Sequence, residues 1–501
     1  MDPMGTAVSS LSAMFIRGMK LPNYFSGGAA LLLLVQLLLC RVPGIDTTGG
    51  GATPRRGSSH LLKPTTSSTT AGTANTAGTA GALAGRRFYA TTTSGSESIL
   101  LNEIKALPDV THAKAGKLGC TFQGTALTGF AAALQLRTSL KVCEVLAESD
   151  AGVEIRNPQD LYVFSRDSVA WCDILSSKQH TIRVESVLGA VHESLSHSHY
   201  TSLTVKNAIV DHHRDKTLDR PNVDIINPDV PLLVYLHNDK CTIYRVWSGA
   251  SSMHKRGYRG GDDQATHKAS LRETTAASLL LAAGYTGAPD CALLDPMCGS
   301  ASIPIEAALI KLCVAPGLIR YETDNVVPSA TSFLDVEQNS WKTALETAKS
   351  ADRRQASALQ RKKQSGADDC TIYANDIDPG AMALAVESAK RAKVFDLINF
   401  SLGDVSRLQL PPALADRRMV AITNPPWALR LEEGSQDSWT SLGEFSRRNL
   451  QGRTEASHLW VLAGNPALLK FLELGAPHEF LAMNAANVDM RFLHYVLPAN
   501  K

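Results

Sequence analysis

Short apolar segments of strand length alternate with helical segments through the last 250 residues, and this alternation constrains the fold more than any other feature. The pattern predicts seven strands, at 292–295, 371–375, 398–402, 419–423, 458–462, 479–483 and 492–497. Strands that alternate with helices form a doubly wound sheet. The long interval 316–369, which includes a charged helical stretch at 341–363, is expected to be an excursion from this sheet. We therefore expect 251–501 to be one α/β domain.

Two smaller α+β units are expected ahead of this domain. Within 86–150 the alternation is typical of a ferredoxin-like unit. Its strands are expected at 87–92, 119–124 and 139–146, and its helices at 97–107 and 126–136. A second unit is expected within 151–250, with a hairpin that turns at Asn238 and Asp239. Its helices are expected at 161–176 and 202–211, and its strands at 231–236 and 241–247.

Residues 1–85 have the composition of a targeting segment and are excluded from the fold. A short apolar run from Ala29 to Cys40 has the length of a signal-peptide core, and no acidic residue occurs between Thr47 and Ser96. A signal-like part followed by a transit-like part resembles the two-part presequences of plastids acquired by secondary endosymbiosis. We expect a plastid location and no stable membrane association after the presequence is removed. A mitochondrial presequence and a disordered extension with a membrane anchor are the alternatives.

The overall charge and the cysteines limit the classes of site that the chain can carry. The formal net charge is only +2, so any nucleic-acid surface must come from local clusters of charge. The nine cysteines include no C-x-x-C pair, and the histidines show no zinc-site spacing. We expect reduced thiols, no metal site and a monomer.

A strand, a turn of small residues and an apolar helix follow one another in CALLDPMCGSASIPIEAALI (291–310). Such a turn presents backbone N–H groups to a ligand at a helix N-terminus, as in dinucleotide folds. In a methyltransferase, Asp295 at the strand end would accept from the methionine ammonium of the cofactor. The residues of the turn are Cys298, Gly299, Ser300 and Ala301. An ordinary β-turn-α packing unit is the alternative.

Two further carboxylates follow the next two expected strands. Asp376 is placed to accept from both ribose hydroxyls, although it lies much farther along the chain from Asp295 than the usual spacing of about 20 residues. Asp404 is placed to accept from the adenine amino group, with a turn role as the alternative. We expect Asp378 to cap the helix that begins at Pro379.

The fourth expected strand delivers Asn424, Pro425, Pro426 and Trp427 at the carboxyl edge of the sheet. An exocyclic amine of a nucleobase is a weak nucleophile, and the Asn oxygen and a neighbouring carbonyl can hydrogen-bond its two protons. The prolines stiffen the turn and remove two donors, while Trp427 offers a surface for stacking a base. No covalent nucleophile is required. Arg430 is a candidate for orienting phosphate or substrate, and a solvated arginine is equally compatible.

The segment HKRGYR (254–259) interleaves basic groups with an aromatic residue. Such clusters neutralise phosphates and stack bases, so we expect RNA contacts here. An exposed loop without a ligand is the alternative. The contact residues are expected to be His254, Lys255, Arg256, Tyr258 and Arg259.

Several segments together resemble the THUMP-bearing RNA guanine-N2 methyltransferases, especially the RlmL-type enzymes of 23S ribosomal RNA. They are FYATTTSGSESILLNEIKAL (88–107), VKNAIVD (205–211), RPNVD (220–224), HKRGYR, ASLRET (269–274), LLDPMCGSASIPIEAA (293–308), ANDIDP (374–379) and TNPPW (423–427). The resemblance covers the chain from about residue 87 onward. It implies a ferredoxin-like unit, a THUMP domain that docks on structured RNA, and a class I (Rossmann-like) methyltransferase domain.

By the same resemblance the cofactor is S-adenosyl-L-methionine and the product is N2-methylguanosine in large-subunit rRNA. A tRNA guanine-N2 methyltransferase and an inactive RNA-binding factor are the alternatives. We expect no second methyltransferase domain, which some bacterial members carry. The chain departs from the family pattern at Ala301, Trp427 and Ala428. The methyl group of Ala301 is expected to crowd the cofactor, and Ala428 to restrict the loop behind the target base.

Overall fold

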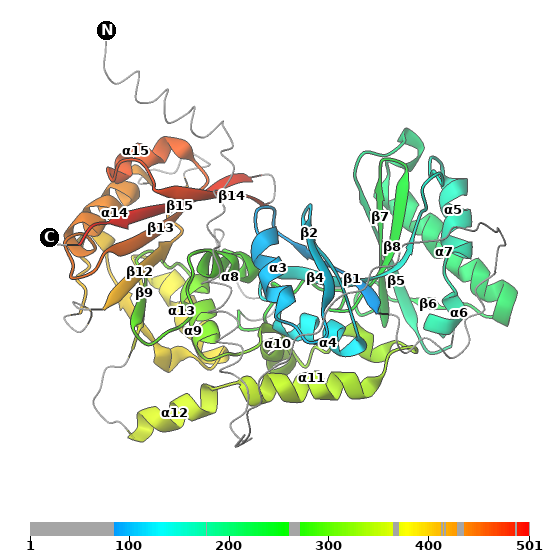
Figure 1. Cartoon of the computed structure of the whole chain (residues 1–501), viewed down its shortest axis with the longest axis horizontal. Helices are drawn as coiled ribbons and strands as arrows, with labels where there is room; N and C mark the ends of the chain where they lie inside the picture. Colours follow the sequence, from blue (N-terminus) through cyan, green and yellow to red (C-terminus); the bar gives the residue numbers. More distant parts are fainter. Residues whose placement is uncertain are drawn as a thin grey trace, which may run out of the picture.

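The computed structural model describes two β-sheets and the helices that cover them (Figure 1). Its described residues are 85–176, 178–259, 271–363, 370–411, 414, 417–427, 435–485 and 488–499. The targeting segment predicted for 1–85 therefore lies outside the described residues, apart from Gly85.

The C-terminal sheet has seven strands in the order β11-β10-β9-β12-β13-β15-β14, which confirms the predicted doubly wound sheet. Its strands are β9 (Cys291–Asp295), β10 (Ile372–Asp376), β11 (Ile398–Leu402), β12 (Arg418–Thr423), β13 (Ser457–Ala463), β14 (Glu479–Ala485) and β15 (Val488–Leu497). β15 runs antiparallel to both of its neighbours, and the other pairs are parallel. The buried apolar runs of β9 and β12 explain why their strands could be predicted from sequence.

Helices cover both faces of this sheet and create two apolar clusters. One cluster lies under α8 (Glu273–Ala282), α9 (Ser302–Lys311) and α13 (Pro379–Arg391), and the other under α14 (Ser435–Asn449). As predicted, Asp378 caps α13 by accepting from the Gly380 N–H. The remaining short elements are η3 (Phe395–Leu397), η4 (Val405–Arg407), η6 (Pro466–Leu468) and α15 (Leu469–Leu472). Parallel strands with helical crossovers place all their carboxyl ends on one edge, and the site is built there.

The two N-terminal units share one eight-stranded sheet, in the order β2-β3-β1-β4-β8-β7-β5-β6. Its strands are β1 (Arg86–Thr92), β2 (Thr111–Gly116), β3 (Gly119–Gly124), β4 (Ser139–Glu148), β5 (Thr181–Leu188), β6 (Asn222–Val223), β7 (Val230–His237) and β8 (Lys240–Val246). β4 pairs with β8, and this pairing joins the two units edge to edge. The polar groups buried at the junction include Arg245 and Glu144, whose Nε and Oε2 atoms are 2.7 Å apart.

The helices that pack on this sheet include one at each of the four predicted positions, but their bounds differ from the predicted ones. They are α3 (Glu97–Lys105), α4 (Ala126–Gln135), α5 (Pro158–Asp167), α6 (Trp171–Ile174), η1 (Glu193–Leu195) and α7 (Ser198–Thr217). The helix predicted at 161–176 is in fact two, α5 and α6, which are separated at Ser168–Ala170. Three strands were not predicted, β2, β5 and β6, because β2 buries almost nothing and β5 alternates only weakly.

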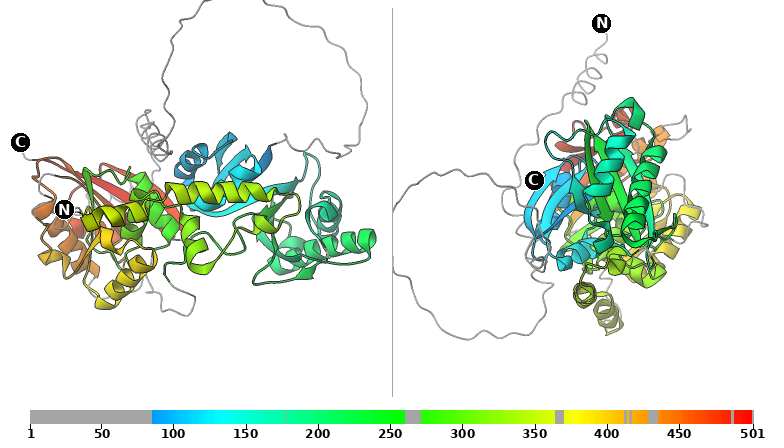
Figure 2. Two further views of the ribbon diagram at one scale, coloured as in Figure 1. Left: turned by 90° about the horizontal axis from the view of Figure 1, so that it is seen from below. Right: turned by 90° about the vertical axis from the view of Figure 1, so that its right-hand side faces the viewer.

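The predicted excursion joins the two halves of the molecule. It contains α10 (Pro316–Asp324), η2 (Ser329–Ser332), α11 (Gln338–Ala351) and α12 (Arg354–Lys363). α11 lies along α4, and Phe333, Ala344 and Ala348 belong to the apolar core of the N-terminal sheet (Figures 1 and 2). Gly317 on α10 approaches α4 so closely that an added Cβ would lie 2.7 Å from the Leu134 Cα atom. The excursion therefore packs against the N-terminal sheet and connects it to the C-terminal unit.

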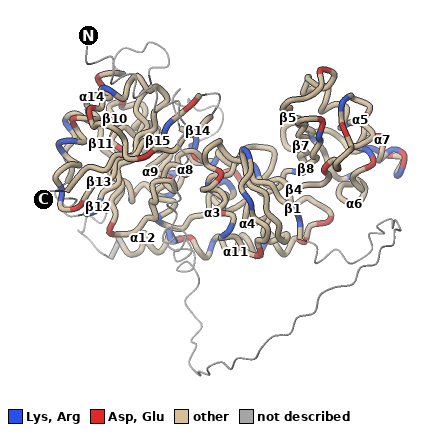
Figure 3. The backbone as a smooth tube through the Cα atoms, turned by 45° about the horizontal axis from the view of Figure 1, so that its top comes forward, with Lys and Arg blue, Asp and Glu red and all other residues tan. Residues whose placement is uncertain are grey.

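Acidic and basic residues are interspersed over both halves (Figure 3). Within the described part of the chain, no single helix has the length and apolar character needed to cross a membrane. The pair α9 and α10 meets these criteria together, but it bends by 106° and α9 is buried under the sheet.

Candidate cofactor and base site

The turn after β9 has the backbone shape of an anion- and dipole-binding nest. Gly299 and Ala301 both have positive φ, at +53° and +58°, and α9 starts directly after them. Ala301 is fully buried and belongs to the apolar cluster around α9. The expected crowding of the cofactor by its methyl group stays a prediction. The alanine places an L-residue in the left-handed region, at a cost of roughly 1–2 kcal/mol.

Asp295, at the end of β9, is 1% exposed and accepts a hydrogen bond from the Met297 N–H at 3.3 Å. Burial raises the pKa of its carboxyl to about 8, and the nearby Asp376 carboxylate adds to this rise. Thr423 and the Met297 N–H act in the opposite direction. A buried carboxyl with a raised pKa stays largely protonated at pH 7. A cation bound beside it would stabilise the ionised form, because the cation offsets the free-energy cost of a buried negative charge.

Asp376 lies beside this turn and organises it. Its Oδ2 atom accepts from the Gly299 N–H at 2.7 Å, and its Oδ1 atom accepts from the Asp378 N–H at 2.9 Å. The neighbouring Asn375 is buried and ties three strand ends together. Its amide donates to the Pro296 and Gly403 carbonyls, and it accepts from the Ser401 hydroxyl. Asn375 was not predicted as a site residue, although a polar amide at the end of an apolar strand is a recognisable signal in the sequence.

Asp404 caps η4 by accepting from the Ser406 N–H at 2.8 Å. This is the turn role named above as the alternative for Asp404. Asp404 lies two residues after the end of β11, at the same edge as Asp295 and Asp376. The structure thus brings the three predicted carboxylates to one edge of the sheet.

Cys298 and Ser300 belong to the same turn and are largely buried. Burial, Asp295 and Asp376 raise the pKa of the Cys298 thiol well above its ordinary value. A thiol in this state stays protonated and is a poor nucleophile. The local chemistry agrees with the expectation that no covalent nucleophile acts here.

The N-P-P-W turn follows β12 and is held by side chains from other elements. Trp439 of α14 donates its indole N–H to the Pro426 carbonyl at 2.8 Å, and Asn465 donates to the Trp427 carbonyl at 3.3 Å. The Trp427 indole donates to the Leu462 carbonyl at 3.1 Å. Within the part of the chain that the structure describes, the buried Asn424 Oδ1 atom accepts no hydrogen bond. An orphaned acceptor is costly unless a ligand satisfies it.

Two predictions at this site fall on residues outside the described part of the chain. These are the orienting role of Arg430 and the effect of Ala428 on the loop behind the target base.

The prediction that HKRGYR forms an RNA-contacting cluster is wrong for Arg256 and Tyr258. Both are fully buried, and both contact the buried Glu306 of α9. The Arg256 Nε atom is 3.4 Å from Glu306 Oε1, and the Tyr258 hydroxyl donates to the same atom at 3.1 Å. A buried carboxylate requires such partners, and Glu306 lies 50 residues later in the sequence.

The rest of that segment is also mostly engaged within the protein. Arg259 is ion-paired with Glu273 and donates to the Ser302 hydroxyl and the Leu271 carbonyl. His254 is half-buried, and its burial together with the cations around it lowers its pKa to about 4, so it is neutral at pH 7. Of the six residues, only Lys255 is exposed. The segment links Glu306 of α9 to the N-terminal half, because Arg256 also donates to the carbonyl of Arg137, which follows α4.

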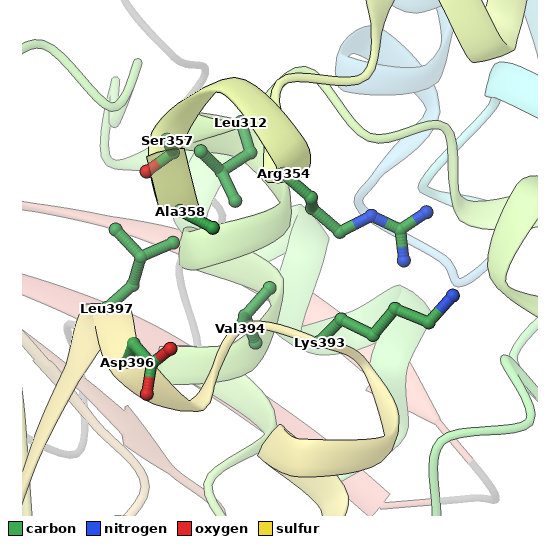
Figure 4. A pocket seen from close by; sticks show the side chains of 8 residues that line it. All are labelled: Leu312, Arg354, Ser357, Ala358, Lys393, Val394, Asp396 and Leu397. Carbon is green, nitrogen blue, oxygen red and sulfur yellow. The ribbon is translucent and has the colours of Figure 1, made fainter. Parts of the chain in front are cut away.

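One hollow of about 230 Å³ lies on the opposite side of the C-terminal unit (Figure 4). It is lined by Leu312, Arg354, Ser357, Ala358, Lys393, Val394, Asp396 and Leu397. The last four precede β11, so they lie at the amino edge of the sheet. Its two cations are both paired with Glu322. This hollow is not part of the site formed by Asp295, Asp376 and Asn424.

Comparisons with known protein families cover nearly the whole described chain. Residues 87–143 match the RlmL ferredoxin-like domain, and residues 167–246 match the THUMP domain. Residues 256–493 match the RMKL-like methyltransferase domain.

Two curated relatives align along most of the chain. The ribosomal RNA large subunit methyltransferase K/L of Syntrophotalea carbinolica is 32% identical over 415 residues, which are 82% of this chain and 53% of that protein. The protein slr0064 of Synechocystis sp., assigned to the RNA methyltransferases, is 30% identical over 82% of this chain and 97% of its own length. The chain spans about half the length of the K/L relatives that it matches.

Solved structures share the architecture. A Listeria monocytogenes protein described as a predicted N6-adenine-specific DNA methylase superposes with a TM-score of 0.66. It is 24% identical, and the match covers 83% of this chain and 97% of that one. SMU.472, which was solved in complex with S-adenosylhomocysteine, also has a TM-score of 0.66, at 17% identity over 83% of this chain and 99% of its own. At these identities the likeness shows the fold.

Proposed function

Since the chain belongs to the RlmL-type family of THUMP-bearing methyltransferases, we propose that it transfers a methyl group from S-adenosyl-L-methionine to RNA. The acceptor that we propose is the N2 amino group of a guanine in large-subunit rRNA. The names of the K/L relatives support the RNA class. The acceptor atom is supported by the N-P-P-W turn.

The residues at the strand ends fit this cofactor. Asp295 would accept from its ammonium group, the 298–301 turn would surround its methionine part, and Asp376 and Asp404 would accept from the ribose and the adenine. The cofactor, when bound, supplies a sulfonium methyl group that is already activated for transfer. The buried and largely protonated Asp295 carboxyl is the feature that a cationic ligand would stabilise.

Residues of the N-P-P-W turn would orient the acceptor nitrogen for methyl transfer. The Asn424 Oδ1 atom and the Pro425 carbonyl would accept the two protons of an exocyclic amine, which orients the nitrogen lone pair away from them and toward the cofactor turn. We assign this role to the Pro425 carbonyl because the Pro426 carbonyl already accepts from the Trp439 indole N–H. Positioning of this kind supplies most of the rate enhancement when no covalent intermediate is formed.

The buried, unpartnered Asn424 Oδ1 atom carries this proposal. The decisive experiment is nucleoside mass spectrometry of organellar RNA after depletion of the protein. We expect one N2-methylguanosine to be lost from large-subunit rRNA. Loss from tRNA with unchanged rRNA would replace rRNA by tRNA as the substrate. No change in either RNA, together with no heat of binding to S-adenosylmethionine in calorimetry, would support an inactive RNA-binding factor.

The location that we propose is an organelle, with a plastid favoured over a mitochondrion. The signal-like and transit-like compositions of 1–85 support this. Residues 1–85 fused to a fluorescent protein should direct it to the plastid. Fluorescence in mitochondria would select the alternative, and diffuse cytosolic fluorescence would exclude both organelles.

A further inference from the structure

The backbone of the N-P-P-W turn depends on outside donors to fix its shape. Pro425 and Pro426 have no N–H, so the turn cannot stabilise itself with hydrogen bonds from these two positions. The carbonyls are the groups through which other residues can orient it. Two of them are engaged, at Pro426 and Trp427, by donors from separate elements.

The first donor, Trp439, is fixed by burial. Its side chain is 0% exposed in the apolar cluster under α14, and its indole N–H reaches the Pro426 carbonyl at 2.8 Å. A large side chain packed in this way has one rotamer and little freedom to shift. The position of the Pro426 carbonyl is therefore set by the packing of α14.

The second donor, Asn465, is fixed by two opposed hydrogen bonds. Its Oδ1 atom accepts from the Ala467 N–H at 3.0 Å as the cap of η6, and its Nδ2 atom donates to the Trp427 carbonyl at 3.3 Å. The adjacent Gly464 lies against the Trp427 ring, where an added Cβ would be 2.5 Å from the Cε3 atom. The end of β13 thus holds both the carbonyl and the ring of Trp427.

We infer that Trp439 and Asn465 are positioning residues for methyl transfer. They hold the Pro426 and Trp427 carbonyls in bonds within the protein and thereby leave the Asn424 Oδ1 atom and the Pro425 carbonyl to face the acceptor amine. Neither residue touches the reacting atoms; both act through the turn. This inference rests on the proposed function for its catalytic consequence, but not for the geometry of the turn.

The test uses substitutions that each remove one donor with a small change of shape, and a control variant accounts for the loss of packing. Trp439→Phe removes the indole N–H. Asn465→Asp removes the amide donor but keeps an oxygen for the Ala467 N–H, and Asp is as good an N-cap as Asn. Trp171→Phe is the matched control, because Trp171 is also fully buried and donates to a backbone carbonyl, that of Ser165 at 2.8 Å, in the middle unit.

The kinetic readout is transfer of labelled methyl groups to unmodified 23S-type rRNA transcribed in vitro. We expect Trp439→Phe and Asn465→Asp each to lower kcat by about 10-fold to 100-fold, since small misplacements of reacting groups have effects of this size. The Kd for S-adenosylmethionine, measured by calorimetry, should change less than 3-fold, and so should the KM for RNA. Trp171→Phe should keep the kcat of the unaltered protein.

The second readout needs neither cofactor nor RNA. In protein labelled with 5-fluorotryptophan, the ¹⁹F resonance of Trp427 can be assigned by its loss in Trp427→Phe. We expect this resonance to shift and broaden in Trp439→Phe and Asn465→Asp and to stay unchanged in Trp171→Phe. An unmoved resonance, or an unchanged kcat in both variants, would overturn the inference. If the unaltered protein transfers no methyl group, the proposed function fails, and the resonance alone decides whether these residues hold the turn.

Discussion

At the scale of single residues, Asp295 links the chemistry of the site to pH. Its identity and its place at the end of a strand could be predicted from the sequence, because an acidic residue after an apolar run is a local pattern. Its pKa could not, since the pKa depends on burial and on Asp376, which lies 81 positions away in the chain.

Cofactor binding should therefore depend on pH with a maximum near pH 8. Below about pH 8 the Asp295 carboxyl is protonated in the free protein and must lose its proton to accept the cofactor's ammonium group. The affinity should fall by up to about tenfold per pH unit as the pH decreases, and it should fall again above about pH 8 as the ammonium deprotonates. Calorimetry at pH 7 in buffers of different ionisation enthalpy should detect release of nearly one proton. No proton release would show that Asp295 is already ionised.

Asp295→Asn should separate stability from binding. The folded-state pKa of about 8 lies above the ordinary value of 3.8, so the folded protein binds this proton more tightly than the unfolded chain does. The free energy of unfolding of the cofactor-free protein therefore falls as the pH rises from 3.8 to about 8. At pH 8.5 the asparagine variant should be more stable by about 1–3 kcal/mol in urea titrations. At pH 4 the difference should vanish, and cofactor binding should be lost at both pH values.

Asn424→Ala should abolish methyl transfer while leaving the Kd for the cofactor within a few-fold. The reason is that the Oδ1 atom is buried without a partner, and in the proposed function it accepts from the acceptor amine and not from the cofactor. Methylation assays and calorimetry on the same preparation measure the two quantities. Equal loss of both would assign Asn424 to the cofactor instead.

At the scale of elements, the spacing of apolar residues along a segment and the burial of that segment decided whether it could be predicted. The central strands β9, β10 and β12 are apolar runs that are almost entirely buried, and all seven strands of the C-terminal sheet were found. β2 was missed because its residues THAKAG are nearly all exposed, and no local pattern marks such an edge strand. HKRGYR was misread for a related reason: four basic groups in a loop normally face solvent, and their buried partner Glu306 is remote in sequence.

The buried tie between this loop and α9 should be visible in stability. Glu306→Gln should lower the free energy of unfolding by about 3–5 kcal/mol, because the Arg256 charge would stay buried without its counter-ion. Urea titrations measure this difference. The exposed neighbour provides the comparison, as Lys255→Ala should cost less than about 0.5 kcal/mol. Similar small losses in both would mean that the Arg256 charge is compensated by the Met253 and Arg137 carbonyls alone, to which its Nη1 and Nη2 atoms donate.

The crossing of α4 and α10 should tolerate no side chain at position 317. In Gly317→Ala the added methyl group would lie 2.7 Å from the Leu134 Cα atom, and backbone must move to accommodate it. We expect a loss of about 1–3 kcal/mol in urea titrations. Gly116→Ala is the control, because its nearest neighbour would be 3.6 Å away. Equal stability of the two variants would show that the helices can separate at no cost.

At the scale of the whole molecule, the two N-terminal units form one sheet that the excursion supports. The ferredoxin-like and THUMP patterns could be recognised separately, but their fusion through β4 and β8 is a non-local pairing that no segment of the sequence reveals. Asp335 of the excursion adds to this junction, since it pairs with Arg245 and with Arg86.

The fused sheet predicts how fragments behave. Residues 151–250 alone would expose the edge of β8 and lose the partners of Arg245, and this fragment should aggregate or stay unfolded. In the full chain, hydrogen exchange should show β4 and β8 opening together. Earlier exchange of β8 than of β4 would indicate that the two units open independently.

Several contacts among the described residues attach the N-terminal sheet to the C-terminal unit. Asn484 of β14 donates its N–H to the Ser94 carbonyl, Arg137 donates to the Val314 carbonyl, and the excursion packs along α4. Under the proposed function, a molecule held rigidly in this way would set a fixed distance between the end that docks RNA and Asn424, so that only a base at that distance would reach Asn424. The choice of nucleotide would then be a matter of length, and lengthening that distance should move the methyl mark along the RNA.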